Sequence, residues 1–104
     1  MADEKTRRDE QVGVKERPRT KRPPRFNVVL LNDDYTTMDF VVEILEDVFR
    51  RSPAEAVQVM LRVHEEGRGV AGTYPLDVAE TKVLAVHERA RRAGFPLRAG
   101  LEEA

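Results

Sequence analysis

The chain has 104 residues, of which 40% are hydrophobic and 36% are charged, and its formal net charge is −1. This length fits one domain, and the lack of cysteine excludes disulfides, thiolate metal sites and thiol nucleophiles. No apolar run approaches the roughly 20 residues of a membrane span, and no apolar signal segment follows the charged start, so we expect a cytoplasmic protein.

The first 25 residues differ in character from the rest of the chain. They contain nine Lys or Arg and five Asp or Glu, whereas residues 26–104 contain nine and fourteen. A segment with so few aliphatic side chains cannot offset about 1–2 kcal/mol of backbone entropy per residue. We therefore expect residues 1–25 to be a disordered arm and residues 26–104 a folded domain. The basic stretch 17–25 could contact nucleic acid, but we favour a solvated tether.

The folded segment is expected to begin with a strand and a helix. Residues 26–31, Phe-Asn-Val-Val-Leu-Leu, are apolar and partly β-branched and stop at Asn-Asp-Asp, which is typical of a buried strand. From Met38 onward, apolar residues recur at the spacing of one helical face. Thr36 or Thr37 can cap this helix.

A second helix is expected from Ser52 to Gly67. Ser52 suits the N-cap, Pro53 the first helical position and Glu55 the return contact of a capping box. Gly67 is suited to a left-handed C-cap. The positions that we expect on the buried face are Val57, Met60, Leu61 and His64.

The remaining residues predict a strand, a helix and a strand. Residues 70–74 form the short strand, and the third helix runs from about Leu76 to Ala93. Its inner stripe is Ala79, Val83, Val86 and Ala90. Residues 96–103 alternate as an edge strand does. The order β-α-α-β-α-β predicts an α+β domain in which a small three-stranded, mostly antiparallel sheet packs on three helices.

Polar residues concentrate at the turn between the first strand and the first helix. Asn32, Asp33 and Asp34 are followed by Tyr35 and Thr36. Ordinary turn chemistry accounts for such residues, but adjacent carboxylates beside an amide also suit a primary ammonium group with several N–H donors. His64 is either a core residue of its helix or a further acceptor for that ammonium.

Catalytic and metal-binding chemistry has little support in the sequence. The two histidines lack the spacing of paired metal ligands, and two carboxylates alone lack the ligand count of a calcium loop. The only serine, Ser52, is explained by helix capping. A hydrolase using Asp33, Asp34 and His64, and a nucleic-acid-binding protein using the basic arm, remain as alternatives. We expect a protein that is not an enzyme and needs no cofactor.

Three motifs follow one another within residues 26–104. They are Asn32-Asp33-Asp34-Tyr35-Thr36-x-Met38-x-Phe40-Val41-Val42, Met60-Leu61-x-Val63-His64-x-x-Gly67 and Val78-Ala79-Glu80-Thr81-Lys82-Val83. Together they closely resemble the ClpS family, the adaptors of the ATP-dependent Clp protease. The chain departs from the family pattern at Thr37, where many members have proline, and at Pro75-Leu76, where a capping hydroxyl is lost.

The resemblance implies an adaptor that binds proteins whose first residue is Leu, Phe, Tyr or Trp. It would hand them to a hexameric Clp AAA+ unfoldase, ClpA-like or ClpC-like, with no nucleic acid or membrane as partner. The implied ligands of the substrate's α-amino group are Asn32, Asp33, Asp34 and His64. The implied hydrophobic pocket is Leu30, Thr36, Met38, Val41, Met60, Val63 and Leu97, with Met38 as its gate. The implied unfoldase-docking residues are Tyr35, Asp77, Glu80 and Lys82.

Overall fold

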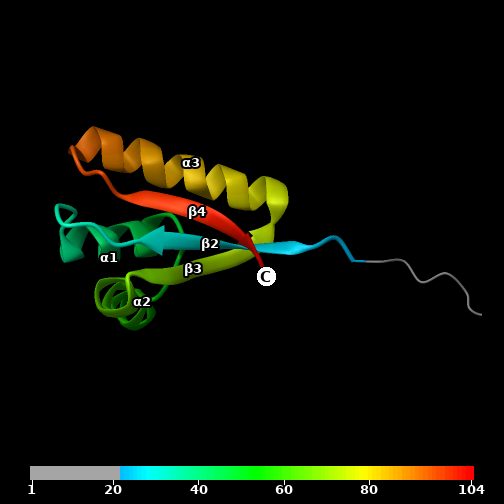
Figure 1. Cartoon of the computed structure of the whole chain (residues 1–104), viewed down its shortest axis with the longest axis horizontal. Helices are drawn as coiled ribbons and strands as arrows, with labels where there is room; N and C mark the ends of the chain where they lie inside the picture. Colours follow the sequence, from blue (N-terminus) through cyan, green and yellow to red (C-terminus); the bar gives the residue numbers. More distant parts are fainter. Residues whose placement is uncertain (1–21) are drawn as a thin grey trace, which may run out of the picture.

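A computed structural model describes residues 22–104, so most of the expected arm, residues 1–21, lies outside the described part. The elements in chain order are β2 (Arg25–Leu31), α1 (Met38–Asp47), α2 (Pro53–Glu66), β3 (Arg68–Pro75), α3 (Leu76–Ala93) and β4 (Arg98–Glu103). Figure 1 shows the three strands side by side, with α3 next to β4 and α2 next to β3. Residues of all three helices join Val28 and Leu30 of β2 in one core cluster. The predicted α+β fold and its β-α-α-β-α-β order are confirmed.

The sheet has the strand order β3-β2-β4, and both pairings are antiparallel. The central strand β2 directs Val28 and Leu30 into the core, where neither side chain is exposed to solvent. Asn27 points to the other face, where its Oδ1 accepts a hydrogen bond from the Thr73 hydroxyl at 2.7 Å. The predicted position of the last strand at an edge of the sheet is confirmed.

Local capping signals determine where α1 and α2 begin. The Thr37 hydroxyl accepts a hydrogen bond from the Phe40 N–H, so Thr37 is the N-cap of α1. Ser52 and Glu55 form the expected capping box of α2, and Gly67 ends this helix with a φ of 87°. Each signal satisfies backbone groups that a helix end leaves without partners, which is why it works independently of the rest of the fold.

The buried face of α2 is shifted by one position along the sequence from the predicted face. Val57 and Leu61 are 42% and 41% exposed, and His64 is also exposed. The residues that pack inward are Ala56, Val59 and Val63, with Met60 half-buried beside them. The physical reason is Gly69 of β3, where an added Cβ would lie 2.8 Å from Val63 Cγ2 and 3.3 Å from the Val59 carbonyl oxygen. The lack of a side chain at Gly69 lets α2 approach the sheet with this face.

The helix α3 covers the sheet with its predicted stripe. Ala79, Val86 and Ala90 are buried and Val83 is half-buried. His87 of the same helix accepts a hydrogen bond at Nε2 from the Ala99 N–H, at 3.0 Å, and thereby joins α3 to β4. In the described part of the chain, no helix is long and apolar enough to cross a membrane.

Candidate functional site

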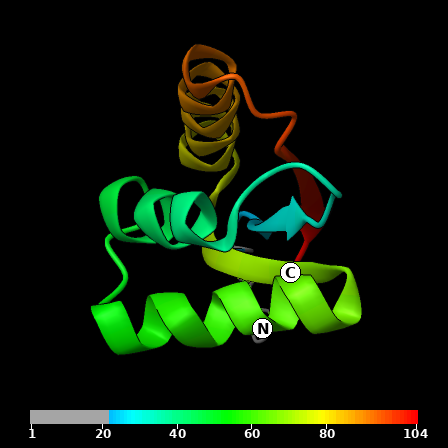
Figure 2. The ribbon, with the colours of Figure 1, turned by 90° about the vertical axis from the view of Figure 1, so that its left-hand side faces the viewer.

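The turn between β2 and α1 lies at one end of the sheet, close to the end of α2. Leu31 of β2 pairs with Arg68 of β3, and the Asn32 N–H donates to the Gly67 carbonyl oxygen at 2.9 Å. Since Gly67 is the C-cap of α2, this bond holds the turn against the last turn of that helix, which carries His64. Figure 2, which views the molecule from this end, shows the loop arching between β4 and α1 with α2 below.

Asp33 uses its carboxylate to fold the turn. Its oxygens accept hydrogen bonds from the Tyr35 N–H at 2.8 Å, the Thr36 N–H at 2.7 Å and the Thr36 hydroxyl at 2.8 Å. Partial burial acts to raise the pKa of Asp33, but these three bonds outweigh it and hold the pKa below its ordinary value of 3.8. Asp33 therefore positions the turn, and it does so with three of the roughly four lone-pair sites of its carboxylate.

We expect the turn to lose stability in acid through Asp33. Because its pKa is lowered by folding, its contribution is complete above pH 3.8 and is lost as pH falls from that value through the lower pKa of the folded state. Asp33→Asn should lose less free energy of unfolding between pH 5 and pH 3 than the unmodified chain. The difference should stay below about 1 kcal/mol, because the carboxylate is largely solvated. Urea unfolding at each pH measures it, and parallel pH profiles for both proteins would contradict the assignment.

A pocket opens between this turn, α1 and α2, and we call it the α1–α2 pocket. Its lining residues are Asn32, Asp33, Asp34, Thr36, Met38, Val41, Met60, Val63 and His64. Aliphatic and thioether groups come from the two helices, while the turn and His64 supply oxygen and nitrogen atoms. The pocket measures about 250 Å³, which is below the roughly 300–1,000 Å³ of typical small-molecule sites. These dimensions suit one large amino-acid side chain.

Three of the polar residues have side chains that no other described residue engages. In the described part of the chain, no hydrogen bond or ion pair involves the side chains of Asn32, Asp34 or His64. All three residues are exposed. The pocket therefore combines an apolar interior with an amide, a carboxylate and an imidazole that are all free to accept hydrogen bonds.

The structure separates two residues from the predicted pocket. Leu30 is fully buried and Leu97 is 3% exposed, and both belong to the hydrophobic core rather than to the lining of the α1–α2 pocket. Leu30 lies in the central strand β2, where it faces the helices. The other five predicted pocket residues and the four predicted polar ones do line the pocket.

The four predicted docking residues do not form one cluster. Tyr35 follows the Leu31 end of β2, whereas Asp77 follows Pro75, which pairs with Arg25 at the opposite end of that strand. Asp77 and Lys82 line a hollow of about 530 Å³ beside Val48, the C-cap of α1. Lys82 is half-buried there, since its Nζ donates to the Val48 carbonyl oxygen at 2.7 Å and lies 5.5 Å from the centroid of the Tyr74 ring.

An apolar residue on α3 is absent from the sequence-based set. Leu84 is 67% exposed and lines a separate hollow with Glu80, Val83 and Leu101. Helical spacing is the signal that could have found it, because Leu84 is four residues after Glu80 and seven after Asp77 on the same face.

In residues 22–104, no three side chains of the metal-binding types lie close enough together to hold a metal ion.

Comparison with known proteins places the chain in a family. The model of the family "ATP-dependent Clp protease adaptor protein ClpS" matches residues 21–100. The chain is 58% identical over 95 residues to a ClpS adapter of Wolinella succinogenes, covering 91% of this chain and 93% of the relative. It is 55% identical over 105 residues to that of Oleidesulfovibrio alaskensis, covering 99% of each.

A solved structure agrees with this match. Agrobacterium tumefaciens ClpS2 bound to L-phenylalaninamide is similar with a TM-score of 0.77 and 40% identity, over 80% of this chain and 100% of that one. Fold and sequence therefore lead to one conclusion. The chain belongs to the ClpS family of ATP-dependent Clp protease adaptor proteins.

Proposed function

We propose that this protein binds other proteins through a free N-terminal Leu, Phe, Tyr or Trp and delivers them to a Clp AAA+ unfoldase, without catalysing a reaction itself. Residues 26–104 would bind the substrate, and residues 1–25 would serve delivery. The observation that carries the proposal is a set of acceptors that no residue of the described range 22–104 engages, Asn32, Asp34 and His64, at an apolar pocket sized for one side chain.

The chemistry of an N-terminus fits these acceptors. A free terminal ammonium has three N–H donors, whereas an acetylated or internal amide nitrogen has one at most. A blocked terminus would leave acceptors desolvated and without partners, at about 1–3 kcal/mol for each group. The ligand of the related ClpS2, L-phenylalaninamide, has the same parts: a free amine, an aromatic side chain and a carboxamide in place of the next peptide bond.

The apolar lining favours Leu and aromatic side chains. Burying such a side chain contributes roughly 1.5–3 kcal/mol. Met38, in the first turn of α1, is 43% exposed at the pocket, so its thioether can pack against a bound ring. A β-branched first residue such as Ile carries an extra group on Cβ, next to the turn that Asp33 holds in place.

Delivery would use the exposed face of α3. Asp77, Glu80 and Leu84 lie on this face, and Asp77 is in the first turn of α3, at the end of the sheet away from the turn at Asn32. Pro75 offers no side-chain cap to the first turn of α3, where Asp77 Oδ1 accepts from the Val78 N–H at 2.9 Å; within the described residues the N–H groups of Leu76 and Asp77 are left for a partner. A bound substrate and a docked unfoldase could then occupy the adaptor together.

The test uses the full chain and C-terminally labelled peptides that begin with Leu. We expect fluorescence anisotropy to give a Kd in the micromolar range or below for the free terminus and a Kd at least 30-fold higher for the acetylated one, since two unpaired acceptors cost about 2 kcal/mol or more. An Ile-start peptide serves as the side-chain control and should bind at least several-fold more weakly. Equal affinity for free and acetylated peptides would overturn the proposal.

A further inference from the structure

The turn at Asn32–Asp34 is also the wall of a second hollow, which we call the Arg98 groove. Its lining residues are Leu31, Asn32, Asp33, Asp34, Tyr35, Pro96 and Arg98, and it measures about 660 Å³. The three residues of the turn line both this groove and the α1–α2 pocket. Figure 2 shows the loop between the segment that leads into β4, on one side, and the helices α1 and α2, on the other.

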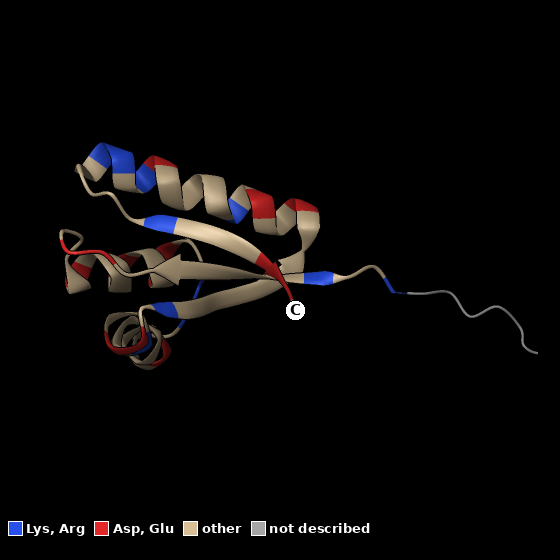
Figure 3. Cartoon of the chain, viewed as in Figure 1, with Lys and Arg blue, Asp and Glu red and all other residues tan. Residues whose placement is uncertain are grey.

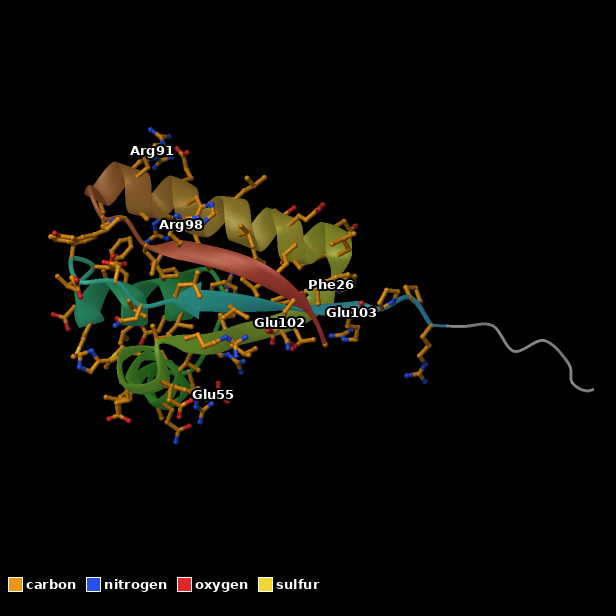
Figure 4. All side chains as sticks on the ribbon, viewed as in Figure 1. Phe26, Glu55, Arg91, Arg98, Glu102 and Glu103 are labelled. Atoms are coloured by element: carbon orange, nitrogen blue, oxygen red, sulfur yellow. The ribbon has the colours of Figure 1, made fainter. Side chains whose placement is uncertain are left out.

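The groove offers apolar surface and one cation. Tyr35 is 77% exposed and Leu31 is 40% exposed. Arg98 begins β4, where its Cα pairs with that of Leu31 at the end of β2. Figure 4 labels its side chain at this end of the strand, and Figure 3 shows the basic start of β4 at the same end of the molecule as the acidic turn.

The Arg98 guanidinium is available to a ligand. Within residues 22–104 it makes no ion pair and no side-chain hydrogen bond, although neighbouring arginines do. Those pairs are Arg68 with Glu102, Arg89 with Glu43 and Asp47, and Arg91 and Arg92 with Glu88. A guanidinium that binds a carboxylate can donate two parallel N–H bonds, so an acidic side chain is the ligand that it suits best.

A polypeptide bound by its amine reaches this groove within one or two residues. The amine would lie at Asn32 and Asp34, which are part of the shared wall, and consecutive Cα atoms are about 3.8 Å apart. The second and third residues therefore lie within reach of the other side of that wall. We propose that the Arg98 groove receives these residues and that Arg98 favours an acidic side chain among them; this inference rests on the proposed function.

The experiment is a double-mutant cycle between Arg98 and the charge of the second residue. Leu-start peptides carry Glu, Gln or Lys at position two, with a second series varied at position three. Arg98→Gln should weaken binding of the Glu peptide about threefold more than binding of the Gln peptide, as expected for an exposed ion pair. The same variant should bind the Lys peptide more tightly than the unmodified chain does. The matched control is Arg62→Gln, which changes the net charge equally on an exposed residue of α2 that lines neither hollow.

The outcomes separate this inference from the proposed function. If the unmodified chain does not bind the Leu-Gln peptide with a free amine, the proposed function fails and the inference fails with it. If the Leu-Gln peptide binds equally well to the unmodified chain and to the Arg98→Gln variant, the variant is folded and its α1–α2 pocket is intact. A Glu-to-Gln affinity ratio that is then the same in both proteins, in both peptide series, overturns the inference alone.

Discussion

Replacement of Asp34 by Ala should weaken binding of a Leu-start peptide by about 10- to 100-fold. A hydrogen bond to a charged group contributes about 1.5–3 kcal/mol, and each 1.4 kcal/mol changes Kd tenfold. Asp34 is exposed and makes no internal hydrogen bond within residues 22–104, so the variant should fold normally. Anisotropy gives the change in Kd, and thermal unfolding checks that the Tm is unchanged.

The matched control removes a carboxylate nearby that lies outside the pocket. Glu65 follows His64 on α2, is exposed and does not line the α1–α2 pocket. Glu65→Ala should change Kd less than twofold. Asp34→Asn keeps an oxygen acceptor without the charge and should give an intermediate loss. If Asp34→Ala and Glu65→Ala bind the peptide alike, Asp34 does not contact the ammonium.

Leu30→Ala should lower the free energy of unfolding by about 2–5 kcal/mol, the usual loss for a large aliphatic side chain removed from a core. The side chain has no solvent exposure and lies in the central strand of the sheet. Its removal leaves a cavity among residues from several elements, which cannot all move inward to fill it. Urea unfolding should show a lower midpoint at an unchanged m-value.

The adjacent residue provides the control for this prediction. Leu31 lies on the other face of β2 and is 40% exposed, so Leu31→Ala should cost less than about 1 kcal/mol. At temperatures where Leu30→Ala remains folded, its peptide affinity should stay within a few-fold of the unmodified value, because Leu30 does not line the pocket. Equal stability losses for the two variants would contradict the placement of Leu30 in the core.

The sequence predicted the elements well where the signal is local. Ser52, Glu55 and Gly67 mark the ends of α2 because each satisfies backbone groups of its own helix, whatever lies around it. Thr37 does the same for α1. The rotation of α2 about its axis was predicted wrongly, because apolar residues occur on two adjacent faces. Packing of Val59 and Val63 against Gly69 of β3 selects between these two faces.

The candidate site also has features that the sequence predicts and features that it does not. The turn residues and His64 could be singled out from the sequence, the latter with the help of the family resemblance. Asp33 and Asp34 look alike in the sequence, yet the Asp33 carboxylate holds the turn through three hydrogen bonds and the Asp34 carboxylate makes none within residues 22–104. Nor does the sequence distinguish Leu30 and Leu97, both core residues, from the aliphatic residues that line the pocket.

Composition, helix caps and strand alternation depend on residues close together in the chain, so the sequence alone determined the fold class and the element boundaries to within a few residues. Which helix face is buried, which carboxylate is free and which residues from α1, α2 and the turn share one pocket depend on contacts between distant segments. Those contacts are selected by the shape of the packed core. Only the tertiary structure therefore decided the pocket, and with it the placement of Arg98 across the same turn from that pocket.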